Sequence, residues 1–193
     1  MIYWILILLF LLIKIAFGSV VFRKREVEEI DKFIYALLYR GYAEEGPVGN
    51  GELSIIMKNR DISLIKYKEK GKIGIYILIY TDEIAKGKKE IFEKGLNERG
   101  IEYYEREFKK PAYLIDMGTD IERIKETIRF LGEKIYEKWD KVSLVFIDIC
   151  EDINKIIDYE DTKELEEKGI DIRIPTVVWQ WLLWKIRNPR GKI

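Results

Sequence analysis

The chain has 193 residues, and its 34 lysines and arginines balance its 34 aspartates and glutamates, so the formal net charge is zero. That balance gives no overall attraction to polyanions, and nucleic acid is not expected as a partner. The absence of histidine excludes histidine-dependent catalytic triads and histidine zinc sites within the chain. Cys150, the single cysteine, excludes an intramolecular disulfide and is interpreted as a core residue. The wealth of isoleucine, lysine and glutamate is typical of heat-adapted (thermophile) proteins.

The most apolar stretch covers residues 2–22, where Lys14 is the one charged side chain. A helix of this length would cover roughly 30 Å, the thickness of a bilayer's hydrocarbon core. We therefore predict a single transmembrane helix that, with its basic flank, occupies residues 1–25. Lys14 has two interpretations of equal weight. Its long stem could carry the charge toward an interface, or the charge could contact a partner helix.

The flanks of the apolar stretch predict its orientation. Tyr3 and Trp4 suit the headgroup layer at one end, and Arg23, Lys24 and Arg25 follow the other end. Because positive flanks stay in the cytoplasm, we expect a single-pass protein of the cell membrane with a cytoplasmic C-terminal domain. A cleaved signal peptide is the alternative, but it would require cations before the stretch and small residues after it.

Residues 26–51 are expected to link this anchor to a domain. Apolar residues recur at helical spacing over 26–40, and a glycine-rich loop follows over 41–51. The alternation of apolar and polar residues then predicts two strands, 52–57 and 61–68, that form a hairpin.

An α+β domain is predicted over residues 52–150. Its second part resembles the ferredoxin-like βαββαβ arrangement, which implies a four-stranded antiparallel sheet with two helices on one face. A capping box from Thr119 to Glu122 opens the second helix. The hairpin over 52–68 would compete for an edge of strand 72–80 that the ferredoxin-like arrangement needs for another strand. Either the hairpin bends away, or the strand order differs from the ferredoxin-like one. The predicted elements are strands 72–80, 101–108, 112–117 and 142–149, and helices 82–99 and 120–139.

Residues 151–193 form an acidic and then tryptophan-rich C-terminal extension. It contains a short predicted strand, 170–174, and a helix, 176–187, too short to span a bilayer. This helix either packs on the domain, the more common outcome, or lies as an amphipathic helix in the membrane interface. The residues that would contact the interface are Trp179, Trp181, Trp184, Lys185 and Arg187.

Carboxylates mark a first candidate site. In the ferredoxin-like arrangement, Asp116, Asp148, Glu151 and Asp152 would gather at one sheet edge, where clustered oxygens could bind Mg²⁺ or Ca²⁺. Helix and turn capping also explains these residue types, and this structural interpretation is favoured.

A second candidate site comes from the order of elements over 26–108, which is similar to that of restriction-endonuclease-like nucleases. The stretch from Gly49 to Ile55 resembles the glycine-rich approach to the metal-binding acid in one branch of that family. The resemblance implies Glu52 as a metal ligand and Lys66 as the cation beside the attacked phosphate. Leu64 stands where the family has its second polar residue, which leaves the metal site incomplete.

No complete catalytic set follows from these patterns, and no cofactor is expected. The leading hypothesis is a non-enzymatic, membrane-anchored protein that scaffolds or regulates partners. Those partners are the lipid bilayer and a membrane or cytoplasmic protein. The alternative is a membrane-anchored, degenerate nuclease or metal-dependent phosphoesterase. The patterns leave the oligomeric state open.

Overall fold

A computed structural model describes residues 2–26, 29–40, 51–57, 60–85, 87–108, 110–137, 141–147, 165, 167, 169–170 and 172–189. In these ranges, seven strands form one antiparallel sheet in the order β1-β7-β2-β3-β4-β6-β5. The strands are β1 (Val21–Glu26), β2 (Glu52–Met57), β3 (Arg60–Glu69), β4 (Lys72–Tyr80), β5 (Tyr103–Glu107), β6 (Pro111–Asp116) and β7 (Lys141–Ile147).

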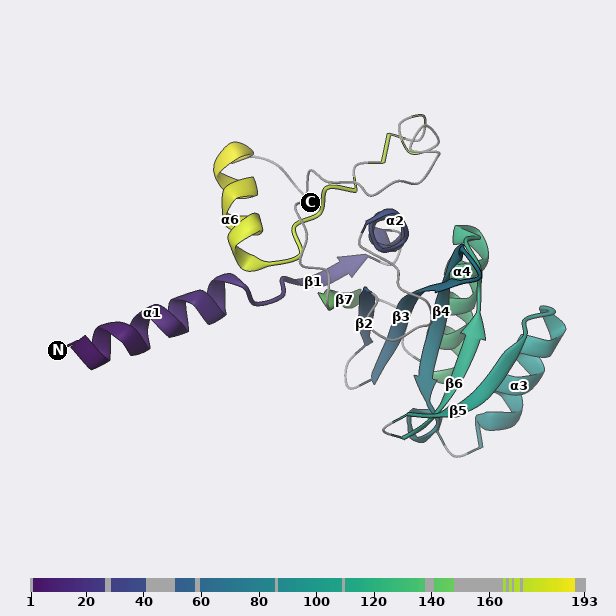
Figure 1. Cartoon of the computed structure of the whole chain (residues 1–193). Coiled ribbons are helices and arrows are strands. Elements are labelled where there is room, and N and C mark those ends of the chain that lie inside the picture. The colour runs from purple at the N-terminus through teal and green to yellow at the C-terminus, as the bar shows by residue number, and fades with distance from the viewer. Residues whose placement is uncertain are drawn as a thin grey trace.

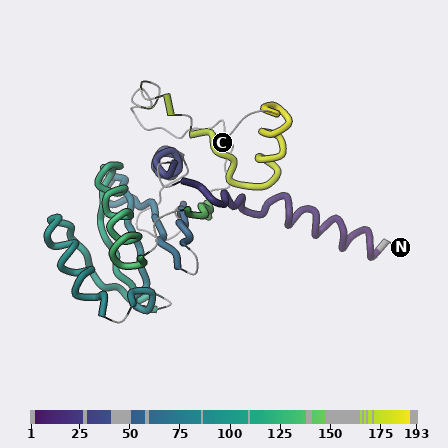
Figure 2. The backbone as a smooth tube through the Cα atoms, turned by 180° about the vertical axis from the view of Figure 1, so that it is seen from behind, coloured from purple at the N-terminus to yellow at the C-terminus, as the bar shows by residue number. Residues whose placement is uncertain are grey.

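Helices cover one face of this sheet, while the N-terminal helix projects away from it (Figures 1 and 2). The covering helices are α2, α3 and α4, and α6 lies near the base of the projecting helix α1. The bounds are α1 (Ile2–Ala16), α2 (Ile30–Tyr39), α3 (Lys89–Glu98), α4 (Ile121–Phe130) and α6 (Val178–Arg187), with a 3₁₀ turn η2 (Thr81–Glu83) and a π-helical turn η3 (Leu131–Ile135).

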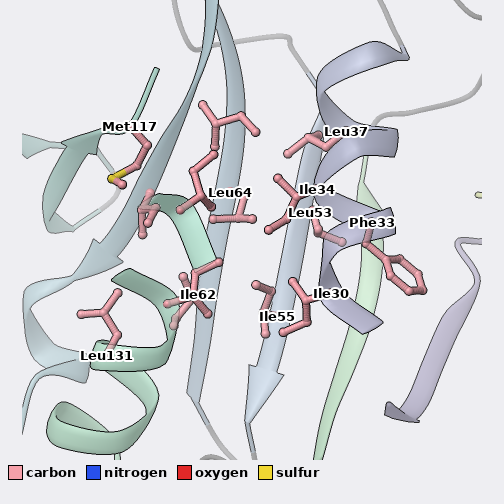
Figure 3. Packing of buried hydrophobic residues seen from close by; sticks show 14 of the residues in the cluster. Ile30, Phe33, Ile34, Leu37, Leu53, Ile55, Ile62, Leu64, Met117 and Leu131 are labelled. Atoms are coloured by element: carbon pink, nitrogen blue, oxygen red, sulfur yellow. The ribbon is translucent and has the colours of Figure 1, made fainter. Parts of the chain in front are cut away.

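The core lies between the sheet and these helices. Alternate residues of β2 and β3 point to the helix-covered side of the sheet, where the apolar residues of α2 recur every three to four positions (Figure 3). Both patterns bring apolar surfaces together, and burial of each large apolar side chain contributes about 1.5–3 kcal/mol. The residues that meet are Leu53, Ile55, Ile62 and Leu64 of the strands and Ile30, Phe33, Ile34 and Leu37 of the helix.

A two-residue turn joins β3 to β4. Lys70 and Gly71 both have positive φ, 52° and 79°, and Glu69 pairs with Lys72 on either side of them. This conformation matches the twist of a tight antiparallel hairpin. The turn therefore makes β3 the immediate neighbour of β4.

The strand order corrects the ferredoxin-like prediction. The α+β class and the antiparallel sheet are confirmed, but β7 pairs with β1 and β2 instead of β4. The edge of β4 that β7 would need is taken by β3, because a two-residue turn makes that pairing the more local one. Strands β2 and β3 are thus inserted into the middle of the predicted sheet.

The prediction of a transmembrane helix is wrong for this structure. Among the residues that the structure describes, no helix is long and apolar enough to cross a membrane. Helix α1 ends at Ala16, so its 15 residues cover only about 22 Å. The chain then turns at Gly18 and enters β1, where Phe22 is buried with its ring centroid 5.0 Å from that of Phe33. The apolar run is therefore divided between an exposed helix and the domain core.

Other element boundaries differ for local reasons. The helix predicted over 82–99 is split into η2 and α3, because Gly87 between them has a φ of 92° that a helix does not allow. Asp120, not Thr119, caps α4, since its Oδ1 accepts from the Arg123 amide at 3.0 Å. No strand forms in the described part of 170–174, and most of 151–168 lies outside the described residues.

Candidate functional site

The main candidate for a functional surface is α1. Every described side chain from Tyr3 to Ile15 is exposed, with the large apolar ones between 47% and 82% accessible. Apart from Lys14, all of these side chains are apolar or aromatic, so the helix has no polar face. Exposed apolar surface of this extent in a folded chain marks an interaction site.

The base of α1 is fastened to the C-terminal part of the chain. The Val20 amide donates to the Thr176 carbonyl, and the Val178 amide donates to the Gly18 carbonyl, each at 3.0 Å. Ser19 forms an isolated antiparallel bridge with Val177 between these two bonds. As a result, α6 begins where α1 ends, and we call the two helices together the apolar arm.

Helix α6 adds a second apolar surface to the arm. Its Gln180 is buried, and the Oε1 atom accepts from the amide and the hydroxyl of Thr176 at 3.1 and 3.2 Å. This polar contact fixes the first turn of α6, which runs across the direction of α1 (Figure 1). The apolar side chains left exposed on α6 are Trp179, Leu182, Leu183 and Ile186, while Trp181 and Trp184 are half-buried.

Cations lie beside both helices. Arg23 and Lys24 are exposed on β1, where Lys24 takes a positive φ of 54° in an irregular part of the pairing with β7. Arg25 contacts Glu29 at 3.5 Å. On α6, Arg187 is exposed and Lys185 lies with its Nζ 5.3 Å from the centroid of the neighbouring Trp184 ring.

The end of α1 at Ala16 also changes the position of Lys14. In a helix over 2–22 it would lie near the middle, but in the structure it lies in the last turn of α1. A cation there is favoured by the helix dipole. Its Nζ atom is 5.1 Å from the centroid of the Phe10 ring. Tyr3 and Trp4 lie at the opposite, free end of the helix.

The two residues of the nuclease-like prediction are not brought together. Glu52 pairs with Ile65, so the two share a face of the sheet, and Lys66 points to the opposite, helix-covered face. Lys66 is buried there and donates from Nζ to the Arg40 carbonyl at 2.7 Å. Glu52 accepts from the Ser54 hydroxyl at 3.2 Å.

The carboxylates of the predicted metal site are only partly described. Asp116 Oδ1 accepts from the Tyr67 hydroxyl at 2.8 Å and from the Gly118 amide at 3.0 Å, as a turn carboxylate does. Strands β2, β3 and β4 lie between β6, which carries Asp116, and β7. Within the described ranges no group of three histidine, cysteine or acidic side chains could hold a metal ion. Cys150 and the remaining predicted ligands, Asp148, Glu151 and Asp152, lie outside the described residues.

The face of the sheet opposite the helices carries an aromatic cluster that the sequence did not predict. Tyr67 and Tyr76 stack with ring centroids 4.1 Å apart, and the Tyr76 hydroxyl donates to Glu69 Oε1 at 2.9 Å. Burial, together with hydrogen bonds to neighbouring groups, raises the pKa of both phenols. Gly74 is required beneath this stack, because a Cβ there would lie 2.5 Å from the Tyr67 ring. These contacts stabilise the sheet.

A pair of carboxyl groups was also missed. Glu83 of η2 is partly buried, and Asp61 at the start of β3 is one of the groups that shift its pKa. Burial and the Asp61 charge raise the pKa of Glu83 to about 7, whereas the Arg60 charge acts in the opposite direction. No sequence pattern pointed to this interaction, because the two residues are far apart along the chain.

Comparison of the chain with protein-family models, with curated proteins and with solved structures gave no match.

Proposed function

We propose that the chain is a non-enzymatic tethering protein, which holds its α+β domain at the surface of a lipid bilayer and presents it to partners there. The attachment uses the apolar arm and requires no helix that crosses the bilayer. The observation that supports it is the exposure of α1 on all sides, without a polar face.

The free energies favour transfer of α1 from water into lipid. Its ten exposed aliphatic and phenylalanine side chains from Ile5 to Ile15 are each about half accessible. Burying what remains exposed would contribute on the order of 10 kcal/mol. The Lys14 charge opposes insertion by at most about 3 kcal/mol, and less where its stem reaches the headgroups from the last turn of α1.

Lipid fits α1 better than a second copy of the chain does. A partner helix covers one side of α1, which would leave the other sides in water, whereas acyl chains surround a helix completely. When α1 points into lipid, α6 lies across its direction near the bilayer surface. Trp179, Leu182 and Ile186 of α6 are exposed and available for contact with lipid. Tryptophan and the nearby Arg187 suit the headgroup layer.

Vesicle flotation tests the proposal. The full-length chain, purified in mild detergent, is diluted into vesicles of phosphatidylcholine and phosphatidylglycerol and centrifuged through a density gradient. One variant changes Leu6, Leu8, Leu11 and Leu12 to glutamine, and a matched control changes the same leucines to methionine. We expect the wild-type chain and the methionine control to float with the vesicles, and the glutamine variant to remain at the bottom.

The same three proteins also test whether α1 binds a second copy of the chain instead of lipid. Circular dichroism first confirms that all three proteins keep the same fold, as the exposure of the changed side chains predicts. Sedimentation velocity without vesicles then measures self-association. A wild-type chain that stays at the bottom of the gradient and forms oligomers that the glutamine changes abolish would refute the lipid proposal in favour of a second copy.

A further inference from the structure

Strand β1 is irregular just beyond the base of the apolar arm (Figure 1). The register of its pairing with β7 shifts between Phe22 and Arg25. Within that interval two residues of β1, Arg23 and Lys24, lie opposite one residue of β7, Ser143. Two residues opposite one form a β-bulge, which changes the direction in which the following side chains point.

The bulge directs two cations outward. In a regular strand, alternation would place Lys24 on the same face as the buried Phe22. The extra residue gives that place to Arg25, whose guanidinium lies 5.6 Å from the Phe22 ring centroid. Arg23 and Lys24 are both exposed, and we call them the bulge cations.

The bulge cations carry charge that the neighbouring acids do not neutralise. Neither cation forms an ion pair with another residue that the structure describes, because the acids of this corner already have partners. Glu26 lies 3.1 Å from Lys141, and Glu29 lies 3.5 Å from Arg25. Two adjacent positive charges are therefore available to an anion outside the domain.

One of the bulge cations has a strained backbone. Lys24 has a φ of 54°, in the left-handed region that is costly for a residue with a Cβ and easy for glycine. Glycine would therefore suit the geometry of the bulge better than lysine does. Strain of this kind is concentrated at functional sites, which favours a role for the lysine charge.

We propose that the bulge cations bind the phosphate of an anionic phospholipid headgroup. The proposal rests on the tethering function, because α1 must enter the bilayer before β1 comes near its surface. Only four residues separate Ala16, the end of α1, from Val21, the start of β1, so insertion of α1 holds both charges close to the headgroups. The high local concentration of headgroups there favours lipid over phosphate in solution.

Vesicle titration tests this site. The full-length chain, purified in mild detergent, is titrated with vesicles of phosphatidylcholine alone and of phosphatidylcholine mixed with phosphatidylglycerol. Each cation near an anionic surface strengthens binding about fivefold. We therefore expect the wild-type chain to bind the anionic vesicles about tenfold or more tightly than the neutral ones, and the double variant Arg23→Gln/Lys24→Gln to lose most of this preference.

A matched control removes the same two charge types elsewhere. The double variant Lys72→Gln/Arg106→Gln changes an exposed lysine of β4 and an exposed arginine of β5, on the far side of the sheet from β1. At strand spacings of about 4.8 Å these positions lie well beyond the Debye length of about 8 Å at physiological salt. The control should keep the wild-type preference for anionic vesicles.

The variant Lys24→Gly separates the charge from the shape of the bulge. Glycine adopts the same positive φ without strain, so this variant should unfold at the same urea concentration as the wild type or a higher one. Its preference for anionic vesicles should nevertheless fall severalfold. Inorganic phosphate, added at matched ionic strength, should not displace the wild-type chain from these vesicles.

The outcomes separate this site from the tethering function. Equal wild-type affinity for both vesicles, an anionic preference that the bulge double variant keeps, or displacement by inorganic phosphate would overturn the headgroup site. Binding to neutral vesicles would continue in each case if the tethering function holds. Absence of binding to either vesicle would refute both proposals.

Discussion

Replacing Glu83 with glutamine should change how the stability of the chain depends on pH. The folded-state pKa of Glu83 is raised from 4.5 to about 7, chiefly by burial and then by Asp61. Between these two values the folded chain binds more protons than the unfolded chain, so its free energy of unfolding falls as pH rises. The stability that the Glu83 proton contributes is fully present below pH 4.5 and is lost once the pH passes the folded-state pKa of about 7. Glutamine does not titrate and removes this dependence.

The size of the effect follows from the shift. A rise in the pKa of Glu83 from 4.5 to about 7 corresponds to a change in the free energy of unfolding of at most about 3 kcal/mol, at 1.36 kcal/mol per pH unit. Glu83 is only partly buried, so water screens its interactions and we expect about 1–2 kcal/mol.

Urea unfolding in mild detergent at pH 5 and at pH 8, followed by tryptophan fluorescence, provides the test. The stability of Glu83→Gln relative to wild type should rise by about 1–2 kcal/mol between the two pH values. The comparison with wild type at each pH cancels the contributions of the other titrating groups. Equal differences at both pH values would refute the reasoning, because the Glu83 proton would then make no pH-dependent contribution to folding.

Three further substitutions test the packing. Gly74→Ala should destabilise the chain by about 1–3 kcal/mol, because the new Cβ forces the Tyr67 ring to move, and chemical denaturation will measure it. Phe22→Ala should lower the free energy of unfolding by about 3–5 kcal/mol, because the contact with Phe33 is lost. Hydrogen exchange along β1 should then be faster, and unchanged exchange would mean that other contacts hold β1. Gln180→Ala leaves buried donors without their acceptor at a cost of about 1–3 kcal/mol, and limited proteolysis should then cut near α6 first.

Local patterns predicted most of the sheet's strands. The alternation in β2 and the doubly apolar run of β4 gave the observed bounds, because each depends on residues next to one another. The pairing of β7 with β1 and β2 depends on partners more than eighty residues away, which no local pattern encodes.

The apolar N-terminal stretch shows the limit of hydropathy. Residues 2–22 carry a single charge, Lys14, yet Gly18 divides them into an exposed helix and a strand. Phe22 is as apolar as Phe10, but one is buried in the core and the other is exposed on α1. Composition alone does not distinguish these two environments.

The candidate sites also depended on the fold in a way that residue types alone did not predict. Glu52 and Lys66 looked like a site because of their residue types, but the strand register places them on opposite faces of the sheet. Glu83 gave no signal among the many charged residues of the chain, because its raised pKa depends on burial and on the Asp61 charge, which only the fold provides. The tryptophan-rich helix was expected either to pack on the domain or to lie in a membrane interface, and in the structure α6 is partly buried and partly exposed.

Transfer of α1 into lipid is the central claim, and an environment-sensitive fluorophore on α1 tests it most directly. The label is attached at position 9 through Leu9→Cys, with Cys150 replaced by serine, and at the exposed Lys94 of α3 as the control site. On addition of phosphatidylcholine and phosphatidylglycerol vesicles, emission from position 9 should shift to the blue and rise in intensity, while emission from position 94 should not change. An unchanged signal at position 9, or the same change at both positions, would contradict attachment through α1.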